Sequence, residues 1–353
     1  MAFSDFMNQA RSLHAAGAGR QSGDPQAAAA QPNRSGIADR YYLPQLIPAL
    51  LLIAYGCVVM WSASLNIADA NFPRHVFGAV LGLAVAEVVR RYDYRALANL
   101  STALAIIDAL LMISPRIPGL GSYAMGMTGW VKIPLIGVTF QPSEPAKIVT
   151  IYLMASLCAQ YNGKIDELKD YIKMCAMLCM PFLLILVQPD LGTGLIVLVV
   201  GATIIICSGA KPSWVLCTIA LIVAVAALAI MTSMVPGMPH VLKEYQLNRL
   251  IVFVDPSVDP SGNGYNLQQS KIAVGAGGFL GKGIGNASQS GTGFLPEAHT
   301  DFVFALLAEE FGFVGSAALL LLFGWMVFST IGLAQRVEQP FAKLVLAGVA
   351  TMW

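Results

Sequence analysis

Long apolar segments alternate with short polar segments along most of this chain. The hydrocarbon core of a bilayer needs about 20 apolar residues of helix, and several segments approach that length once flanking residues are added. The predicted spans are residues 47–62, 76–89, 97–113, 146–159, 174–187, 191–207, 214–235 and 302–328, with another beginning at Leu344. The pattern therefore predicts an all-α polytopic membrane protein with about eight spans and a partial ninth.

Residues 1–42 differ from the rest of the chain because they have no periodic apolar face and are rich in Ala, Gln, Ser and Gly. This composition is typical of a disordered tail. The tail is basic, so we expect it to stay in the cytoplasm. Residues 43–353 then form one transmembrane domain, in which residues 236–300 are a large extracytoplasmic loop.

Lys and Arg residues fall in alternate loops between the predicted spans. Cytoplasmic loops carry an excess of these residues, and this excess sets the orientation of a membrane protein. With the tail inside, the short basic loops also lie inside; they carry Arg90, Arg91, Arg95, Lys164, Lys169, Lys173, Lys211, Arg336 and Lys343. We therefore expect a multi-pass membrane protein with a cytoplasmic N-terminus.

Composition supports this class. The chain is 56% hydrophobic and 12% charged, whereas soluble domains are about 25% charged. Its net charge of +1 gives no indication of nucleic-acid binding. The four His residues are scattered without the spacing of metal ligands, and the cysteines lie inside apolar segments, as small packing residues do.

The segment FLPEAHTDFVFALLAEE joins a Gly-rich loop to the long apolar segment 302–328. Ionisable residues at the mouth of a membrane helix are costly, so they are functional candidates. Asp301 is our main catalytic candidate, and Glu297 and His299 could orient a head group. Ala305 and Ala308 share the helix face of Asp301, which predicts a small surface with room for substrate. The alternative is that Asp301 only caps the helix.

Two polar motifs lie at other predicted helix starts. In QPSEPAK, Ser143 is a candidate N-cap, and Glu144 and Lys147 are neighbours on one helix face. They form either a structural ion pair or one wall of a polar cavity that also includes Trp130. In QPDLGTG, Asp190 caps the next helix, lines the cavity, or does both.

The loop 236–300 carries basic residues beside many glycines. Arg249, Lys271 and Lys282 stand out, and Lys beside Gly-rich backbone suits an anionic head group. The alternative is a flexible loop, because a Gly pattern without a preceding strand is weak evidence for phosphate binding.

Four motifs carry a resemblance to a known family. The chain resembles the SEDS family of cell-wall polymerases, RodA and FtsW, in four motifs that occur in the family's order. These motifs are QPSEPAK, QPDLGTG, NRLIVFVDPSVDPSGNGYNLQQSKIAVGAGGF and FLPEAHTDFVFALLAEEFGFVG. The resemblance covers about residues 43–353. Residues 269–273 and 308–310 are more similar to RodA than to FtsW.

The resemblance implies a SEDS-type bundle of ten transmembrane helices with a large outer loop before the eighth. It implies a multi-pass protein of the bacterial plasma membrane, a glycosyltransferase that polymerises lipid II into peptidoglycan at the outer face of this membrane, for cell elongation and shape. The implied partner is a class B penicillin-binding protein, a transpeptidase. In the family motif His-Thr-Asp-Phe the Asp is the catalytic residue, and here it is Asp301.

Two features depart from the family. Gly129 stands where the family usually has Arg before the Trp, which weakens a role for Trp130. The sequence ends within the ninth span. We expect this short span to lie at the interface or to pack incompletely, and the chain expressed as printed to be poorly stable or inactive.

The expected chemistry is glycosyl transfer with inversion, in which a carboxylate takes the proton from the acceptor hydroxyl. The pyrophosphate leaving group needs positive charge rather than a protein acid. The candidates for this role are Arg74, Lys147, Arg249, Lys271 or a divalent cation. No other cofactor is expected. The competing hypotheses are a flippase or transporter of lipid-linked precursors, and a non-catalytic scaffold for the transpeptidase.

Overall fold

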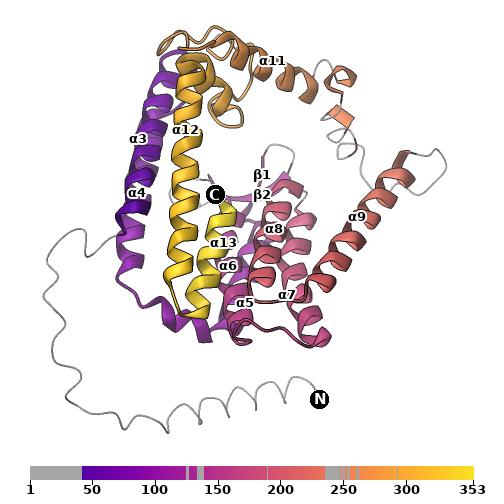
Figure 1. Cartoon of the computed structure of the whole chain (residues 1–353). Coiled ribbons are helices and arrows are strands. Elements are labelled where there is room, and N and C mark those ends of the chain that lie inside the picture. The colour runs from indigo at the N-terminus through magenta and orange to yellow at the C-terminus, as the bar shows by residue number, and fades with distance from the viewer. Residues whose placement is uncertain are drawn as a thin grey trace, which may run out of the picture. The chain divides into compact units, whose positions relative to one another are not determined.

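The computed structural model describes residues 42–124, 127–132, 139–188, 190–234, 247, 251–252, 255–259, 262–291 and 293–353 (Figure 1). The chain divides into two units, Met1–Leu43 and Pro44–Trp353. The helices and strands that the structure describes lie in the second unit, except that the first of them begins one residue earlier, at Leu43.

The apolar segments of the sequence form helices, as predicted. Their bounds are α3 (Leu43–Asn66), α4 (Phe72–Arg90), α5 (Ser101–Ile113), α6 (Ser143–Ala159), α7 (Leu168–Val187), α8 (Leu191–Cys207), α9 (Pro212–Met234), α12 (Val303–Arg336) and α13 (Pro340–Met352). Within the described part, α3, α4, α7, α9 and α12 are long and apolar enough to cross a membrane. Short 3₁₀ turns, η2 (Tyr94–Asn99) and η3 (Ser114–Arg116), flank α5.

The main core lies between α5, α6, α7, α8 and α13. Its largest fully buried side chains include Met112, Ile151 and Ile204. We expected the short last helix to lie at the interface or to pack incompletely, but its Phe341 and Leu344 are 2% and 4% exposed and belong to this core.

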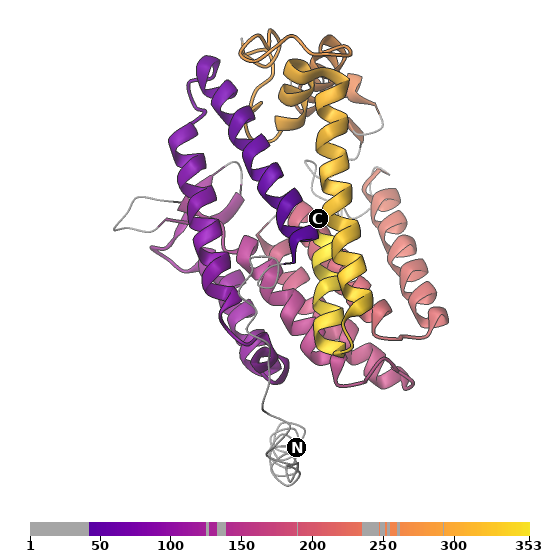
Figure 2. The ribbon, with the colours of Figure 1, turned by 60° about the vertical axis from the view of Figure 1, so that its left-hand side comes forward.

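A second apolar cluster joins α3 to the first part of α12. Near one end of the contact, the rings of Tyr55 and Phe311 meet edge to face, with centroids 5.5 Å apart. Near the other end, Gln45 accepts hydrogen bonds from Ser329 and Thr330 at 2.8 and 2.9 Å. Figure 1 shows the two helices beside each other, and in Figure 2 α3 lies between α4 and α12. Helices α4 and α9 bury none of their apolar span windows, as expected for helices that face lipid.

The segment between α5 and α6 contains a small antiparallel sheet that we did not predict. Its strands are β1 (Gly121–Ala124), β2 (Met127–Lys132) and β3 (Thr139–Phe140), in the order β1-β2-β3. Ser122 pairs with Trp130, and Lys132 pairs with Thr139. The strands are too short to produce a clear alternation of polar and apolar residues.

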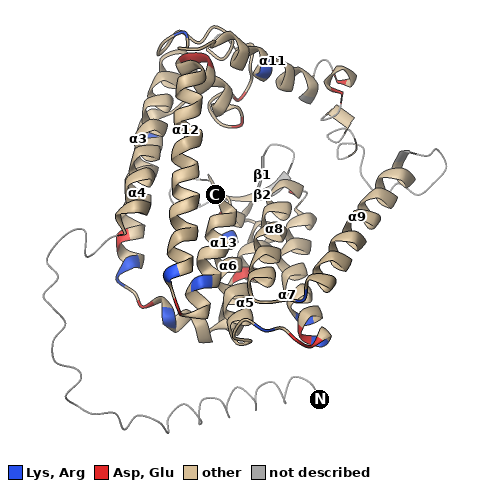
Figure 3. Ribbon diagram, in the orientation of Figure 1, with Lys and Arg blue, Asp and Glu red and all other residues tan. Residues whose placement is uncertain are grey.

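Basic residues gather at the end of the bundle where α4 and α12 end (Figure 3). Arg90 lies in the last turn of α4, and Arg336 lies in the last turn of α12. The start of α12, which Asp301 precedes, is at the other end of this helix. This distribution agrees with the orientation predicted from the loops, whereas the side that faces the cytoplasm stays a prediction.

Candidate active site

Asp301 lies in the turn directly before α12. The helix begins at Val303, its N-cap is Phe302, and no side chain caps it. The carboxylate of Asp301 is exposed and has no hydrogen bond or ion pair within the described part of the chain. The alternative that Asp301 only caps the helix is therefore wrong.

Glu297 and His299 belong to the same turn as Asp301. Glu297 has a left-handed backbone with φ of 52°, and its carbonyl oxygen accepts hydrogen bonds from the N–H groups of Thr300 and Asp301 at 3.2 and 3.0 Å. The Nδ1 atom of His299 is shielded from solvent and has no hydrogen-bond partner among the described residues. An unpaired buried polar atom is costly, so this nitrogen is suited to a ligand. The head-group role of both residues stays a prediction.

The helix face below Asp301 is covered by protein at Ala305, whereas Ala308 lines a cavity of about 680 Å³. Helix α11 (Asn263–Ala276) packs on it. Ala305 is 4% exposed and shares a buried cluster with Ala273 of α11. A Cβ atom added at Gly277 would overlap the carbonyl oxygen of Ala308. The small side chains therefore permit close packing of α11 on α12.

Three basic residues of the loop 236–300 have different environments. Lys271 lies in α11, is exposed and has no ion pair within the described residues. Lys282 is bound to the buried Glu309 at 2.8 Å, so our suggestion that it binds a head group is wrong. Arg249 lies outside the described residues. Six residues further along the chain, Asp255 caps the turn η4 (Pro256–Val258), and hydrogen bonds from the hydroxyl and N–H of Ser257 hold the pKa of Asp255 below the usual range.

The expected ion pair at the start of α6 is present. Lys147 Nζ lies 2.9 Å from Glu144 Oε1, and the exposed fractions of the two side chains are 16% and 57%. Ser143 is not the N-cap, because the helix already includes it and Pro142 holds the cap position. The buried hydroxyl of Ser143 has no partner among the described residues.

Asp190 caps α8, as predicted. Its Oδ1 accepts a hydrogen bond from the N–H of Thr193 at 3.1 Å, and its Oδ2 accepts one from Gln141 Nε2 at 3.2 Å. The second bond joins the start of α8 to the loop before α6. Trp130 lies on β2, and its indole N–H is buried without a partner in the described part of the chain. Whether these residues line a substrate cavity stays a prediction.

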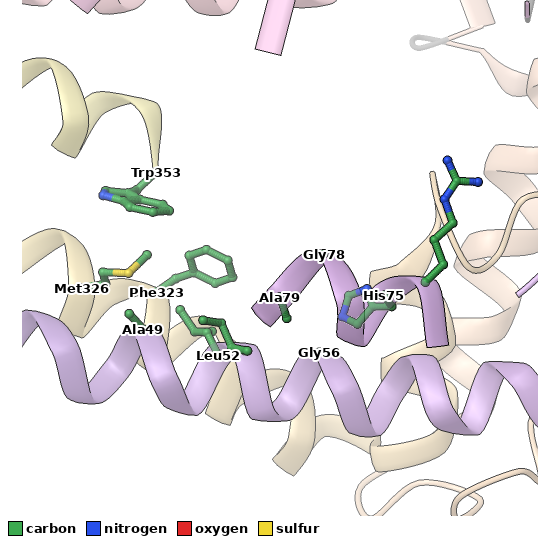
Figure 4. A pocket seen from close by; sticks show the side chains of 11 residues that line it. Ala49, Leu52, Gly56, His75, Gly78, Ala79, Phe323, Met326 and Trp353 are labelled. Atoms are coloured by element: carbon green, nitrogen blue, oxygen red, sulfur yellow. The ribbon is translucent and has the colours of Figure 1, made fainter. Parts of the chain in front are cut away.

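Arg74 lies in the first turn of α4 and lines a cavity of about 610 Å³. Figure 4 shows the apolar lining, with Leu52 and Phe323 on one side and Trp353 near one end. His75 also lines the cavity. An apolar cavity with a basic residue on its lining suits a hydrocarbon chain that carries an anionic group.

Five of the sequence-predicted residues form two groups. The structure brings together Glu297, His299 and Asp301, and it joins Glu144 to Lys147. No hydrogen bond or ion pair of the described residues joins these groups to each other or to Arg74. Sequence reasoning placed Glu309 and Glu310 off the helix face of Asp301 but assigned them no role; they are 0% and 2% exposed. Their position in the middle of an apolar segment was the signal that could have revealed a buried polar network.

Comparison with known proteins gave consistent matches. The family model for FtsW, RodA and SpoVE, described as cell cycle proteins, matches residues 44–353. Peptidoglycan glycosyltransferase MrdB of Escherichia coli K12 is 33% identical over 321 residues, which cover 90% of this chain and 83% of the relative. A probable peptidoglycan glycosyltransferase FtsW of Thioalkalivibrio sulfidiphilus is 33% identical over 314 residues, which cover 86% of this chain and 74% of the relative.

Two solved structures are also similar. One, described as showing structural coordination of polymerization and crosslinking by a peptidoglycan synthase complex, matches with a TM-score of 0.69 and 26% identity, covering 87% of this chain and 82% of that chain. The crystal structure of the rod shape determining protein RodA of Thermus thermophilus matches with a TM-score of 0.58 and 23% identity, covering 91% of this chain and 83% of that chain. The second likeness concerns the fold alone.

Proposed function

Because this chain belongs to the FtsW, RodA and SpoVE family of cell cycle proteins, we propose that it is a peptidoglycan glycosyltransferase. Its substrate is lipid II, an undecaprenyl-pyrophosphate-linked disaccharide peptide, which it polymerises at the outer face of the plasma membrane for cell elongation and shape. The names of the relatives support the reaction. The observation that carries the mechanism is the exposed, unpaired carboxylate of Asp301 directly before a long membrane helix.

Asp301 is the general base in this mechanism. Its carboxylate takes the proton from the acceptor sugar hydroxyl while the oxygen attacks the anomeric carbon of the donor. The bond between that carbon and the pyrophosphate breaks, and the configuration inverts. A positioned base contributes about 10²–10⁴-fold to such a rate.

The leaving pyrophosphate needs positive charge. The described cations proposed for this role are Lys147, Lys271 and Arg74. Arg249, which lies outside the described residues, is the fourth proposed cation. Charge placed where negative charge develops is among the largest contributions to catalysis. The apolar cavity beside Arg74 would hold part of the polyprenyl chain.

The remaining candidates have supporting roles. Glu297 and His299 would orient the head group, and the unpaired Nδ1 of His299 supports this role. Asp190 and Trp130 would line the polar cavity beside Glu144. Among the described residues no group of three His, Cys, Asp or Glu side chains is placed to hold a metal ion. A divalent cation bound mainly by the pyrophosphate oxygens is the alternative source of positive charge.

The partner proposed for this chain is a class B penicillin-binding protein. The similar structure of a peptidoglycan synthase complex supports a partner that crosslinks the strands. The proposed orientation places the tail in the cytoplasm and the loop 236–300 outside, where lipid II and the transpeptidase meet. The distribution of basic residues supports this orientation (Figure 3).

The function is tested with the purified protein in vesicles that contain labelled lipid II, with and without the transpeptidase. We expect glycan strands, resolved by length on a gel. Translocation of lipid II without strands would favour a flippase, and activation of the transpeptidase without either activity would favour a scaffold. Full polymerase activity would also refute the expectation that the 353-residue chain is poorly stable or inactive.

A further inference from the structure

The buried carboxylate of Glu309 binds the Gly-rich loop that leads to Asp301. It accepts hydrogen bonds from Lys282 Nζ at 2.8 Å, the N–H of Gln289 at 2.9 Å, and the N–H and hydroxyl of Ser290 at 3.1 and 2.9 Å. The hydroxyl of Ser288 lies 3.2 Å away. A carboxylate has about four lone-pair sites. This one is therefore saturated by the protein and is 0% exposed, so it does not contact substrate.

Glu310 holds the same loop from the next position of α12. Its Oε1 accepts hydrogen bonds from the hydroxyl of Ser62 on α3 at 2.6 Å and from the N–H of Gly285 at 3.1 Å. Asn66, also on α3, donates to the carbonyl of Gly285 at 2.7 Å. The loop is thus fixed to α3 and α12 at once.

Backbone hydrogen bonds join the loop to an interruption in α12. The helix is broken at Gly312, whose φ is 65° and ψ is −160°. The carbonyl groups of Glu309 and Glu310, which a continuous helix would pair with residues 313 and 314, accept from the N–H groups of Lys282 and Gly283, both at 2.9 Å. The N–H groups of residues 313 and 314 donate to the carbonyl groups of residues 278 and 279 at 2.9 and 3.2 Å. The loop therefore replaces a part of the helix ladder and cannot shift independently of α12.

The path from this anchored loop to Asp301 is short and packed. The N–H of Leu295 donates to the carbonyl of Gln289 at 3.3 Å. Leu295 and Ala298 are both 2% exposed and pack in one cluster with Ala305 of α12. The carboxylate of Asp301 has no described partner, so the backbone of this segment alone sets its position.

We propose that Glu309 and Lys282 are a positioning pair for Asp301: their ion pair, in which the Glu309 carboxylate is buried and Lys282 is partly exposed, holds the loop in the arrangement that places the base against the acceptor hydroxyl. The proposal rests on the proposed function for its effect on rate. Catalysis by a positioned group is sensitive to geometry, and a displacement of about 1 Å far from the chemistry can reduce a rate about 10²-fold.

The experiment compares the variants Glu309→Gln and Lys282→Met with the parent. Lys282→Arg is the conservative variant, which keeps the positive charge. Glu338→Gln is the matched control, because it makes the same change at an exposed glutamate. Hydrogen–deuterium exchange of residues 295–302 is measured together with kcat and KM for lipid II. We expect faster exchange of this segment and a kcat reduced about 10–100-fold at an unchanged KM in the first two variants. Lys282→Arg and Glu338→Gln should resemble the parent.

The proposal would be overturned if Glu309→Gln and Lys282→Met left the exchange of residues 295–302 unchanged. It would also be overturned if these variants lowered the melting temperature but kept the parent kcat in the folded fraction, because the pair would then be purely structural. The exchange measurement needs no activity. If the parent makes no glycan strands, the proposed function fails, whereas the exchange result still decides whether the pair positions Asp301.

Discussion

The contact between the Gly-rich loop and α12 predicts a graded response to three Gly→Ala substitutions. Gly275 lies inside α11 with ordinary backbone angles and open space around it. Gly278 has a left-handed φ of 57° and also faces open space. Gly281 has a φ of 83°, and a Cβ atom there would overlap the carbonyl oxygen of Glu310. The three sites therefore separate helix propensity, backbone strain and steric overlap.

The magnitudes follow from these environments. Gly275→Ala should stabilise the protein by about 0.5–1 kcal/mol, because Ala loses less entropy than Gly in a helix. Gly278→Ala should cost about 1–2 kcal/mol for the left-handed backbone. Gly281→Ala carries the same strain and an overpacking cost of about 1–3 kcal/mol, so it should cost about 2–5 kcal/mol in total.

The assay is thermal unfolding of the purified variants in one detergent, read as the order of their melting temperatures. We expect Gly275→Ala at or above the parent, Gly278→Ala below it, and Gly281→Ala lowest. Equal melting temperatures for Gly278→Ala and Gly281→Ala would show that the loop does not press against α12, and the account of the broken helix would then be wrong.

Three further predictions concern the other parts of the chain. Ser143→Ala should not destabilise the protein, because its hydroxyl has no described partner; a loss of about 0.5–2 kcal/mol in thermal unfolding would restore Ser143 as an N-cap. Asp190→Ala should lower the melting temperature by the equivalent of about 0.5–2 kcal/mol, whereas Asp190→Asn, which still caps, should not; equal effects of the two would remove the cap from the explanation. In a cysteine-free background, Val258→Cys should react with an impermeant thiol reagent from outside the cell and Asp166→Cys should not, and the opposite result would reverse the orientation.

The helices and one cap could be predicted because their signals are local. The bounds of α8 coincide with its apolar segment, Leu191–Cys207. Asp190 precedes it with the short acceptor side chain that a helix start prefers, and Thr193 supplies the N–H. The Glu144–Lys147 pair follows from the spacing of a single helix.

The structure around the candidate site depends on contacts between distant parts of the chain. Glu309 and Ser290 meet through a loop whose many glycines resemble a flexible linker in the sequence. The break at Gly312 is stabilised by carbonyl groups of residues 278 and 279, which no local pattern reveals. Ser143 failed as a cap for a related reason, because Pro142 also begins a helix well and shifted the boundary by one residue.

The central claim is that the carboxylate of Asp301 is the base of a glycosyl transfer. Asp301→Asn tests it most directly, since Asn preserves size and polarity but cannot accept the proton. In the lipid II polymerisation assay, alone and with the transpeptidase, the variant should retain the melting temperature and partner binding of the parent. Its polymerisation rate should fall about 10²–10⁴-fold. Polymerisation at near the parent rate would contradict the account and exclude Asp301 as the base.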